Sequence, residues 1–131
     1  MMVIDTSVLV GALAKDPPIQ ALWDMLTGED ELHVPHLIDY EFRSALRGMI
    51  LREEIVAARA EGACQIKDSM TLVRHSETVT GPRAWELRDN FTIYDASYVA
   101  LAESIGCTLL TSDGKLARTV KTVEVAYVPV A

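Results

Sequence analysis

Four acidic residues stand where a carboxylate is costly unless a partner binds it. They are Asp5, Glu41, Asp95 and Asp113, and each lies at the expected end of a buried strand or on an apolar-faced helix. Burying a charged group without a partner is strongly unfavourable. Carboxylate oxygens are the ligands that hard divalent cations prefer. If the fold brings the four acids together, we expect them to bind such a cation.

Each acid also has an ordinary structural explanation. Asp5 and Asp95 are suited to cap the N-terminus of a helix. Asp113 precedes Gly114 and fits a turn, and Glu41 fits a solvated helix surface. Their joint occurrence favours a common site over four separate explanations. Several anionic oxygens around a cation, with positions left open for water and substrate, are what metal-assisted hydrolysis of a phosphodiester requires.

The net charge sets limits on the partners. The chain of 131 residues carries 19 acidic and 12 basic residues, a net charge of −7, whereas nucleic-acid binding normally needs a basic surface. Setting the four candidate ligands aside leaves fifteen acidic residues against twelve basic ones, and bound cations would supply positive charge locally. The charge therefore does not exclude a nucleic-acid partner.

The N-terminus and the cysteines are typical of a soluble, cytoplasmic protein. The charge-free run of residues 6–14 stops at Lys15 and is too short to span a bilayer, and Asp5 argues against a signal peptide. Cys64 and Cys107 are far apart in the sequence, which fits reduced thiols better than a disulfide framework or a zinc site. We therefore expect no membrane partner.

Hydrophobic periodicity predicts the elements that must position the acids. Strands are predicted at residues 1–4, 32–34, 107–110 and 123–128, and a short extended piece, less clearly marked, at residues 70–73. Helices are predicted at residues 8–14, 19–26, 37–49, 54–68, 82–88, 95–105 and 113–120. The strands are separated by helices, which is typical of a parallel sheet covered on both faces.

This order predicts one α/β domain over residues 1–131, with three layers and a central parallel sheet. Ligands of such sheets bind beyond the C-terminal ends of the strands. Asp5 and Asp113 would both emerge at that edge, and Glu41 and Asp95 would have to face it from helices.

Several segments resemble those of the PIN-domain ribonucleases, and more narrowly the toxins of VapBC toxin-antitoxin pairs. They are Val3-Ile4-Asp5-Thr6-Ser7, Pro35 with Glu41, Tyr94-Asp95-Ala96 with Tyr98 and Ala102-Glu103, and Leu110-Thr111-Ser112-Asp113. The resemblance implies a PIN-like fold in which the four acids hold Mg²⁺ or Mn²⁺. It also implies that a metal-activated water hydrolyses RNA, that the protein is a homodimer, and that an antitoxin tail occupies the acidic groove.

Residues beside the acids have supporting roles in this hypothesis. We expect Ser7 or Thr111 to orient a carboxylate by a hydrogen bond, although an N-cap and strand-end packing explain them equally well. Arg43, Arg47 and Arg88 are candidates to contact RNA phosphates, and a solvated surface is the alternative.

An exposed apolar patch for the antitoxin is a further expectation. Its candidate residues also fit an ordinary core and are Trp23, Leu26, Leu46, Met49 and Ile50.

Two other functions compete with the nuclease. A haloacid-dehalogenase-like phosphatase would use Asp5 as a nucleophile, but that chemistry normally needs a second aspartate where this chain has Ser7. A receiver-like phosphorylation domain would need an acidic pair at the same strand end. The other alternative is a PIN-like binding module without turnover.

Overall fold

The sheet has five strands, all parallel, in the order β3-β2-β1-β4-β5. A computed structural model describes residues 1–130. The strands are β1 (Met2–Ile4), β2 (Leu32–Pro35), β3 (Leu72–His75), β4 (Thr108–Thr111) and β5 (Val125–Tyr127). The predicted three-layer α/β fold is confirmed.

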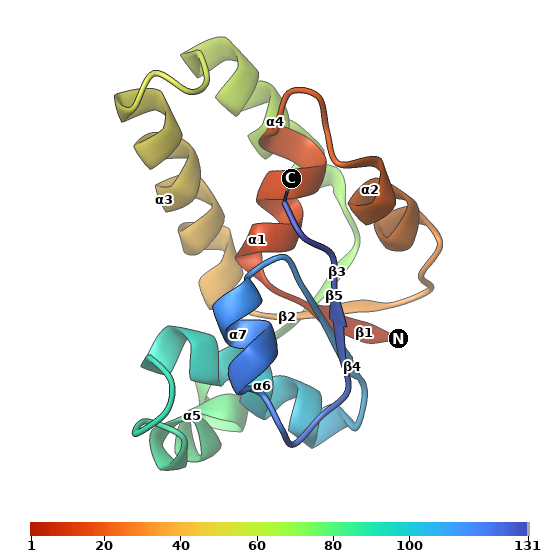
Figure 1. The fold of residues 1–131 in the computed structure, drawn as a ribbon, viewed down its shortest axis with the longest axis vertical. Coiled ribbons are helices and arrows are strands. Elements are labelled where there is room, and N and C mark those ends of the chain that lie inside the picture. Colours follow the sequence, from red (N-terminus) through yellow and green to blue (C-terminus); the bar gives the residue numbers. More distant parts are fainter. Residues whose placement is uncertain (131) are drawn as a thin grey trace.

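Helices cover both faces of this sheet. Figure 1 shows α1 to α4 on one side and α5 and α6 on the other. The first group comprises α1 (Thr6–Leu9), a π-helical turn η1 (Val10–Ala14), α2 (Gln20–Thr27), α3 (Leu37–Leu51) and α4 (Ala57–Ser69). The remaining helices are α5 (Glu77–Glu86), α6 (Ile93–Ile105) and α7 (Gly114–Thr119). Right-handed crossovers produce this arrangement, because the chain moves across the sheet in opposite directions before and after β3.

The core lies around β1, the central strand. All three of its residues are buried, since strands flank it on both sides and helices cover it above and below. Helix α6 packs across β2, β1 and β4, and its residues 96–102 are all buried. Thr92 caps the N-terminus of α6, and Gly106, at a φ of 73°, ends it in the left-handed conformation that glycine adopts without steric cost.

Several element boundaries differ from those predicted from the sequence. The doubtful extended piece at residues 70–73 is strand β3, which starts at Leu72 and runs on to His75. It lies at the sheet edge with Val73 and Arg74 exposed, so its hydrophobic pattern is weak. Helix α5 begins at Glu77 and contains Pro82, although proline was expected to start it.

Two further shifts, at the starts of α4 and α6, are small. Helix α4 begins at Ala57, three residues after the predicted start, because a turn with Glu53 at a φ of 59° follows α3. Helix α6 begins two residues earlier than predicted, so Asp95 lies in its first turn and Thr92 is the N-cap. Within residues 1–130, none of the helices is both long and apolar enough to cross a membrane.

Substitution of Leu101 tests how much the packing of α6 contributes to the stability of the fold. Its side chain is fully buried in the core. We expect Leu101→Ala to lower the free energy of unfolding by about 2–5 kcal/mol, because it removes buried apolar contacts and leaves a cavity. Leu51→Ala, at an exposed position, should change it by less than about 1 kcal/mol. Denaturant unfolding measures both, and equal effects would contradict the assigned packing.

Candidate active site

Two of the four acids follow neighbouring strands at one edge of the sheet. Asp5 follows β1 and Asp113 lies two residues beyond β4, and these strands pair directly, with Ile4 opposite Leu110. The backbone N–H of Asp5 extends this pairing by donating to the carbonyl of Leu110 at 3.3 Å. The strand order switches direction between β1 and β4. In parallel α/β sheets, ligands commonly bind in the crevice beyond the strand ends at such a switch point.

Asp5 is held by donors on both of its carboxylate oxygens. Ser7 donates its hydroxyl hydrogen to Oδ1 at 2.5 Å, and Thr111 donates to Oδ2 at 2.6 Å. The backbone N–H of Val8 also donates to Oδ1, at 3.3 Å. The hydroxyls of Ser7 and Thr111, both expected from the sequence to orient a carboxylate, therefore contact Asp5. Asp5 is also the N-cap of the short helix α1, as expected.

The same two hydroxyls fix the end of β4. Ser7 Oγ accepts the backbone N–H of Ser112 at 2.9 Å, and Thr111 Oγ1 accepts that of Asp113 at 3.0 Å. Asp5 and the residues after β4 thus belong to one hydrogen-bonded unit. The carboxylate of Asp113 in turn caps α7, accepting the backbone N–H groups of Lys115 and Leu116.

Burial raises the pKa of Asp5 to about 6. Its side chain is 6% exposed, so its ionised form loses most of its hydration. Hydrogen bonds from Ser7, Thr111 and the Val8 amide act in the opposite direction, and the nearby charge of Asp113 raises the pKa further. The native structure therefore disfavours the ionised form of Asp5, and a bound cation would stabilise that form.

Glu41 lies in the second turn of α3, which begins just after β2. Thr6 donates to its Oε1 at 3.0 Å, and Tyr98 donates to the same oxygen at 2.6 Å. Tyr98 comes from α6 and is 1% exposed. Sequence reasoning missed these contacts of Thr6 and Tyr98, although Tyr98 follows Asp95 by one helical turn and so shares its face.

Asp95 completes the acidic group. The pKa of its carboxyl is raised, first by burial and then by the charges of Asp113 and Glu41. Helix α3 begins directly after β2, and Tyr98, one turn after Asp95 in α6, donates to Glu41 of α3. The four acids therefore gather at this one edge, close enough to disfavour each other's charge.

The donor set fits a hard divalent cation in its chemistry. All four side chains offer oxygen, and within residues 1–130 no lysine, arginine or histidine forms a salt bridge with any of them. Among the residues described, no three acidic, histidine or cysteine side chains are placed so that together they could hold a metal ion. The fit is therefore one of donor chemistry, and Mg²⁺ typically takes only one or two direct carboxylates and keeps several waters.

Ser112 adds a feature that the sequence did not reveal. It lies between Thr111 and Asp113, is 7% exposed, and its hydroxyl has no hydrogen-bond partner among the residues described. A buried polar group without a partner is costly. The oxygen is itself buried, so it is an unsatisfied polar group just after β4.

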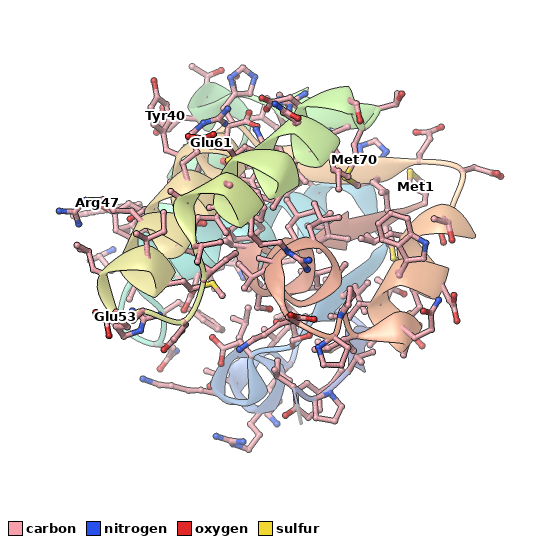
Figure 2. All side chains as sticks on the ribbon, turned by 90° about the horizontal axis from the view of Figure 1, so that it is seen from above. Met1, Tyr40, Arg47, Glu53, Glu61 and Met70 are labelled. Atoms are coloured by element: carbon pink, nitrogen blue, oxygen red, sulfur yellow. The ribbon has the colours of Figure 1, made fainter. Side chains whose placement is uncertain are left out.

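The three arginines proposed from the sequence to contact RNA lie in two different places on the structure. Arg43 forms an ion pair with Asp68 at 2.9 Å, and both Arg43 and Arg47 border the groove between α3 and α4. Figure 2 shows Arg47 pointing outward from the molecule. At 100° per residue, both are on a different side of α3 from Glu41. Arg88 stacks on Trp85, 4.6 Å from the ring centroid, in the segment that leads into α6.

The candidate apolar patch divides into core and surface. Leu26, Leu46 and Met49 are buried, so the core interpretation is confirmed for them. Trp23 and Ile50 are 38% and 37% exposed. Trp23 borders a groove of about 550 Å³ formed with η1 and α4, and Ile50 borders the groove between α3 and α4.

Known proteins resemble the chain over nearly its whole length. The family model described as PIN domain matches residues 2–121. "Ribonuclease VapC9" of Mycobacterium tuberculosis is 39% identical over 119 residues, which cover 91% of each chain. The crystal structure of PAE2754 from Pyrobaculum aerophilum has a TM-score of 0.69 at 25% identity and covers 95% of this chain and 82% of that one. That of VapBC2 from Rickettsia felis, bound to a promoter DNA fragment, has a TM-score of 0.65 at 14% identity over 96% and 97%.

The raised pKa of Asp5 predicts a pH-dependent stability in EDTA. The native state holds the Asp5 proton more tightly than the unfolded state does, so Asp5 lowers stability as pH rises from about 4 to about 6. The full effect above pH 6 is about 3 kcal/mol. Asp5→Asn lacks this titration, so the free energy of unfolding of the variant should rise relative to wild type across that range.

Denaturant unfolding at several pH values measures this difference. Glu124→Gln, an exposed acid at the opposite edge of the sheet, is the matched control and should show a nearly constant difference from wild type. A constant difference for Asp5→Asn as well would contradict the assigned burial of the charge.

Proposed function

The chain belongs to the PIN-domain family, and from this premise we propose that it is a metal-dependent endoribonuclease acting as the toxin of a type II toxin-antitoxin system. The observation that carries the proposal is the acidic group Asp5, Glu41, Asp95 and Asp113 at the switch point of the sheet, with no basic side chain paired to it among residues 1–130. The ribonuclease name of the relative from M. tuberculosis supports RNA as the substrate.

In this proposal the four acids hold Mg²⁺ or Mn²⁺ and form no covalent bond with the substrate. A bound ion of this kind lowers the pKa of a coordinated water and offsets the charge that builds on the phosphate. Ser7 and Thr111 keep both oxygens of Asp5 in a fixed orientation.

The surroundings of Asp5 argue against the phosphatase alternative. A nucleophilic aspartate needs an exposed oxygen to attack phosphorus, whereas Asp5 is 6% exposed and both of its oxygens accept hydrogen bonds. Ser7, which occupies the place of the second aspartate, orients Asp5 and has no acidic group to protonate a leaving group. Trapping a covalent aspartyl phosphate would overturn this assignment.

We also propose a cognate antitoxin whose tail lies in the acidic groove. The solved VapBC2 complex supports a protein partner of this type. An arginine of that tail would complement the unpaired carboxylates and compete with the cation for them. A homodimer in solution is part of the same proposal, and light scattering of the purified protein tests it.

RNA cleavage with and without metal tests the catalytic proposal. We expect cleavage in Mg²⁺ or Mn²⁺ and none in EDTA. Asp95→Asn should reduce kcat/KM by about 100-fold or more, which corresponds to at least about 2.7 kcal/mol of lost transition-state stabilisation. Glu124→Gln is the control for a lost negative charge and should retain wild-type activity.

The outcomes separate the competing functions. Equal cleavage by the wild type in EDTA, by the wild type in metal and by Asp95→Asn would contradict a metal-dependent site. Tight metal binding without cleavage of any RNA tested would favour the non-catalytic binding module.

Arg88 is the arginine that we propose to contact RNA phosphates. It is exposed and lies in the segment leading to the first turn of α6, where Asp95 is found. In the Asp95→Asn background, Arg88→Gln should weaken RNA binding and reduce the slope of log K against log salt by about 0.7, the value for one single-strand phosphate contact. Arg52→Gln, which removes an exposed arginine paired with Glu54, should leave the slope unchanged. Identical slopes for the two variants would disprove the contact.

A further inference from the structure

Glu41 is asymmetrically hydrogen-bonded. Its Oε1 accepts hydrogens from Tyr98 at 2.6 Å and from Thr6 at 3.0 Å, and these two hydroxyls are themselves 3.0 Å apart. Its Oε2 accepts none from residues 1–130. One oxygen is therefore fixed by the protein, while the other remains available to a ligand.

The two donors come from elements that pack around Glu41. Thr6 begins α1, directly after Asp5, and Tyr98 lies on α6, one turn after Asp95. Glu41 itself is on α3. The orientation of the Glu41 carboxylate thus depends on the same helices that carry or follow two of the other acids.

Tyr98 has no other evident need for its hydroxyl. Its ring is 1% exposed and lies within the core cluster, so a phenylalanine would provide the same apolar packing. A buried hydroxyl needs a hydrogen-bond partner, and here both of its contacts, Glu41 and Thr6, belong to the candidate site.

We propose that Tyr98, assisted by Thr6, is a positioning residue that orients Glu41 for the cation. This inference rests on the proposed metal-dependent function. By holding Oε1, the two hydroxyls prevent the carboxylate from rotating and keep Oε2 available as the ligand atom. Partners that orient a metal ligand in this way typically contribute 10- to 100-fold to metal affinity.

Mn²⁺ affinity of the full chain, measured by calorimetry, tests the role of Tyr98. We expect Tyr98→Phe to raise the Kd for Mn²⁺ by about 10- to 100-fold. Tyr94→Phe removes an exposed hydroxyl from the same helix and should leave the Kd unchanged. Thr6→Val should raise the Kd, and Thr6→Ser, which keeps the hydroxyl, should restore it.

A double-mutant cycle with Glu41→Gln separates positioning from a general effect on the fold. If Tyr98 acts through Glu41, Tyr98→Phe should have almost no further effect on Mn²⁺ affinity in the Glu41→Gln background. Additive effects, or an unchanged Kd in Tyr98→Phe, would overturn the inference while leaving the metal-dependent function intact. Failure of the wild type to bind Mn²⁺ would instead overturn the proposed function, and this inference with it.

Discussion

The burial of the Asp5 charge is the constraint on which the rest of the site depends. Asp5 ends the central strand, where neighbouring strands and helices exclude water, and its charge is stabilised only by hydroxyl and amide donors. Ser7 and Thr111 provide those donors and also accept the amides that follow β4. The hydroxyls that stabilise the buried Asp5 carboxylate therefore also hold the backbone of Ser112 and Asp113 just after β4.

Like charges accumulate around Asp5, and nearby Lys115 does not outweigh them at Asp95, whose pKa is raised. Asp113 and Glu41 raise the pKa of Asp95, and Asp113 also raises that of Asp5. Asp39 shows the opposite behaviour: hydrogen bonds from Arg74, and then from Lys67, hold its pKa well below the usual range. Because a ligand that binds only the native state stabilises it by mass action, a cation at the acidic edge would both relieve the repulsion and stabilise the fold.

Strong local signals made much of the fold predictable. Strand β1 is a short apolar run before an N-cap, and α6 has clear helical spacing that ends at Gly106. Strand β3 was only doubtfully expected, because an edge strand with exposed Val73 and Arg74 has little hydrophobic pattern. Helix α5 was predicted to start at Pro82, since proline in a helix interior is unfavourable, yet packing against α6 extends the helix on both sides of it.

The sequence by itself determined which groups are present: four acids at element ends, hydroxyls beside them, and an order of strands and helices that implies a parallel sheet. These properties are local, because side-chain chemistry and periodicity can be read over a few residues. Only the tertiary structure decided that Thr6 and Tyr98 share one oxygen of Glu41, and that Arg43 pairs with Asp68 away from the acids. These contacts join residues 25 to 57 positions apart, so they depend on how whole helices pack against the sheet, which no local pattern specifies.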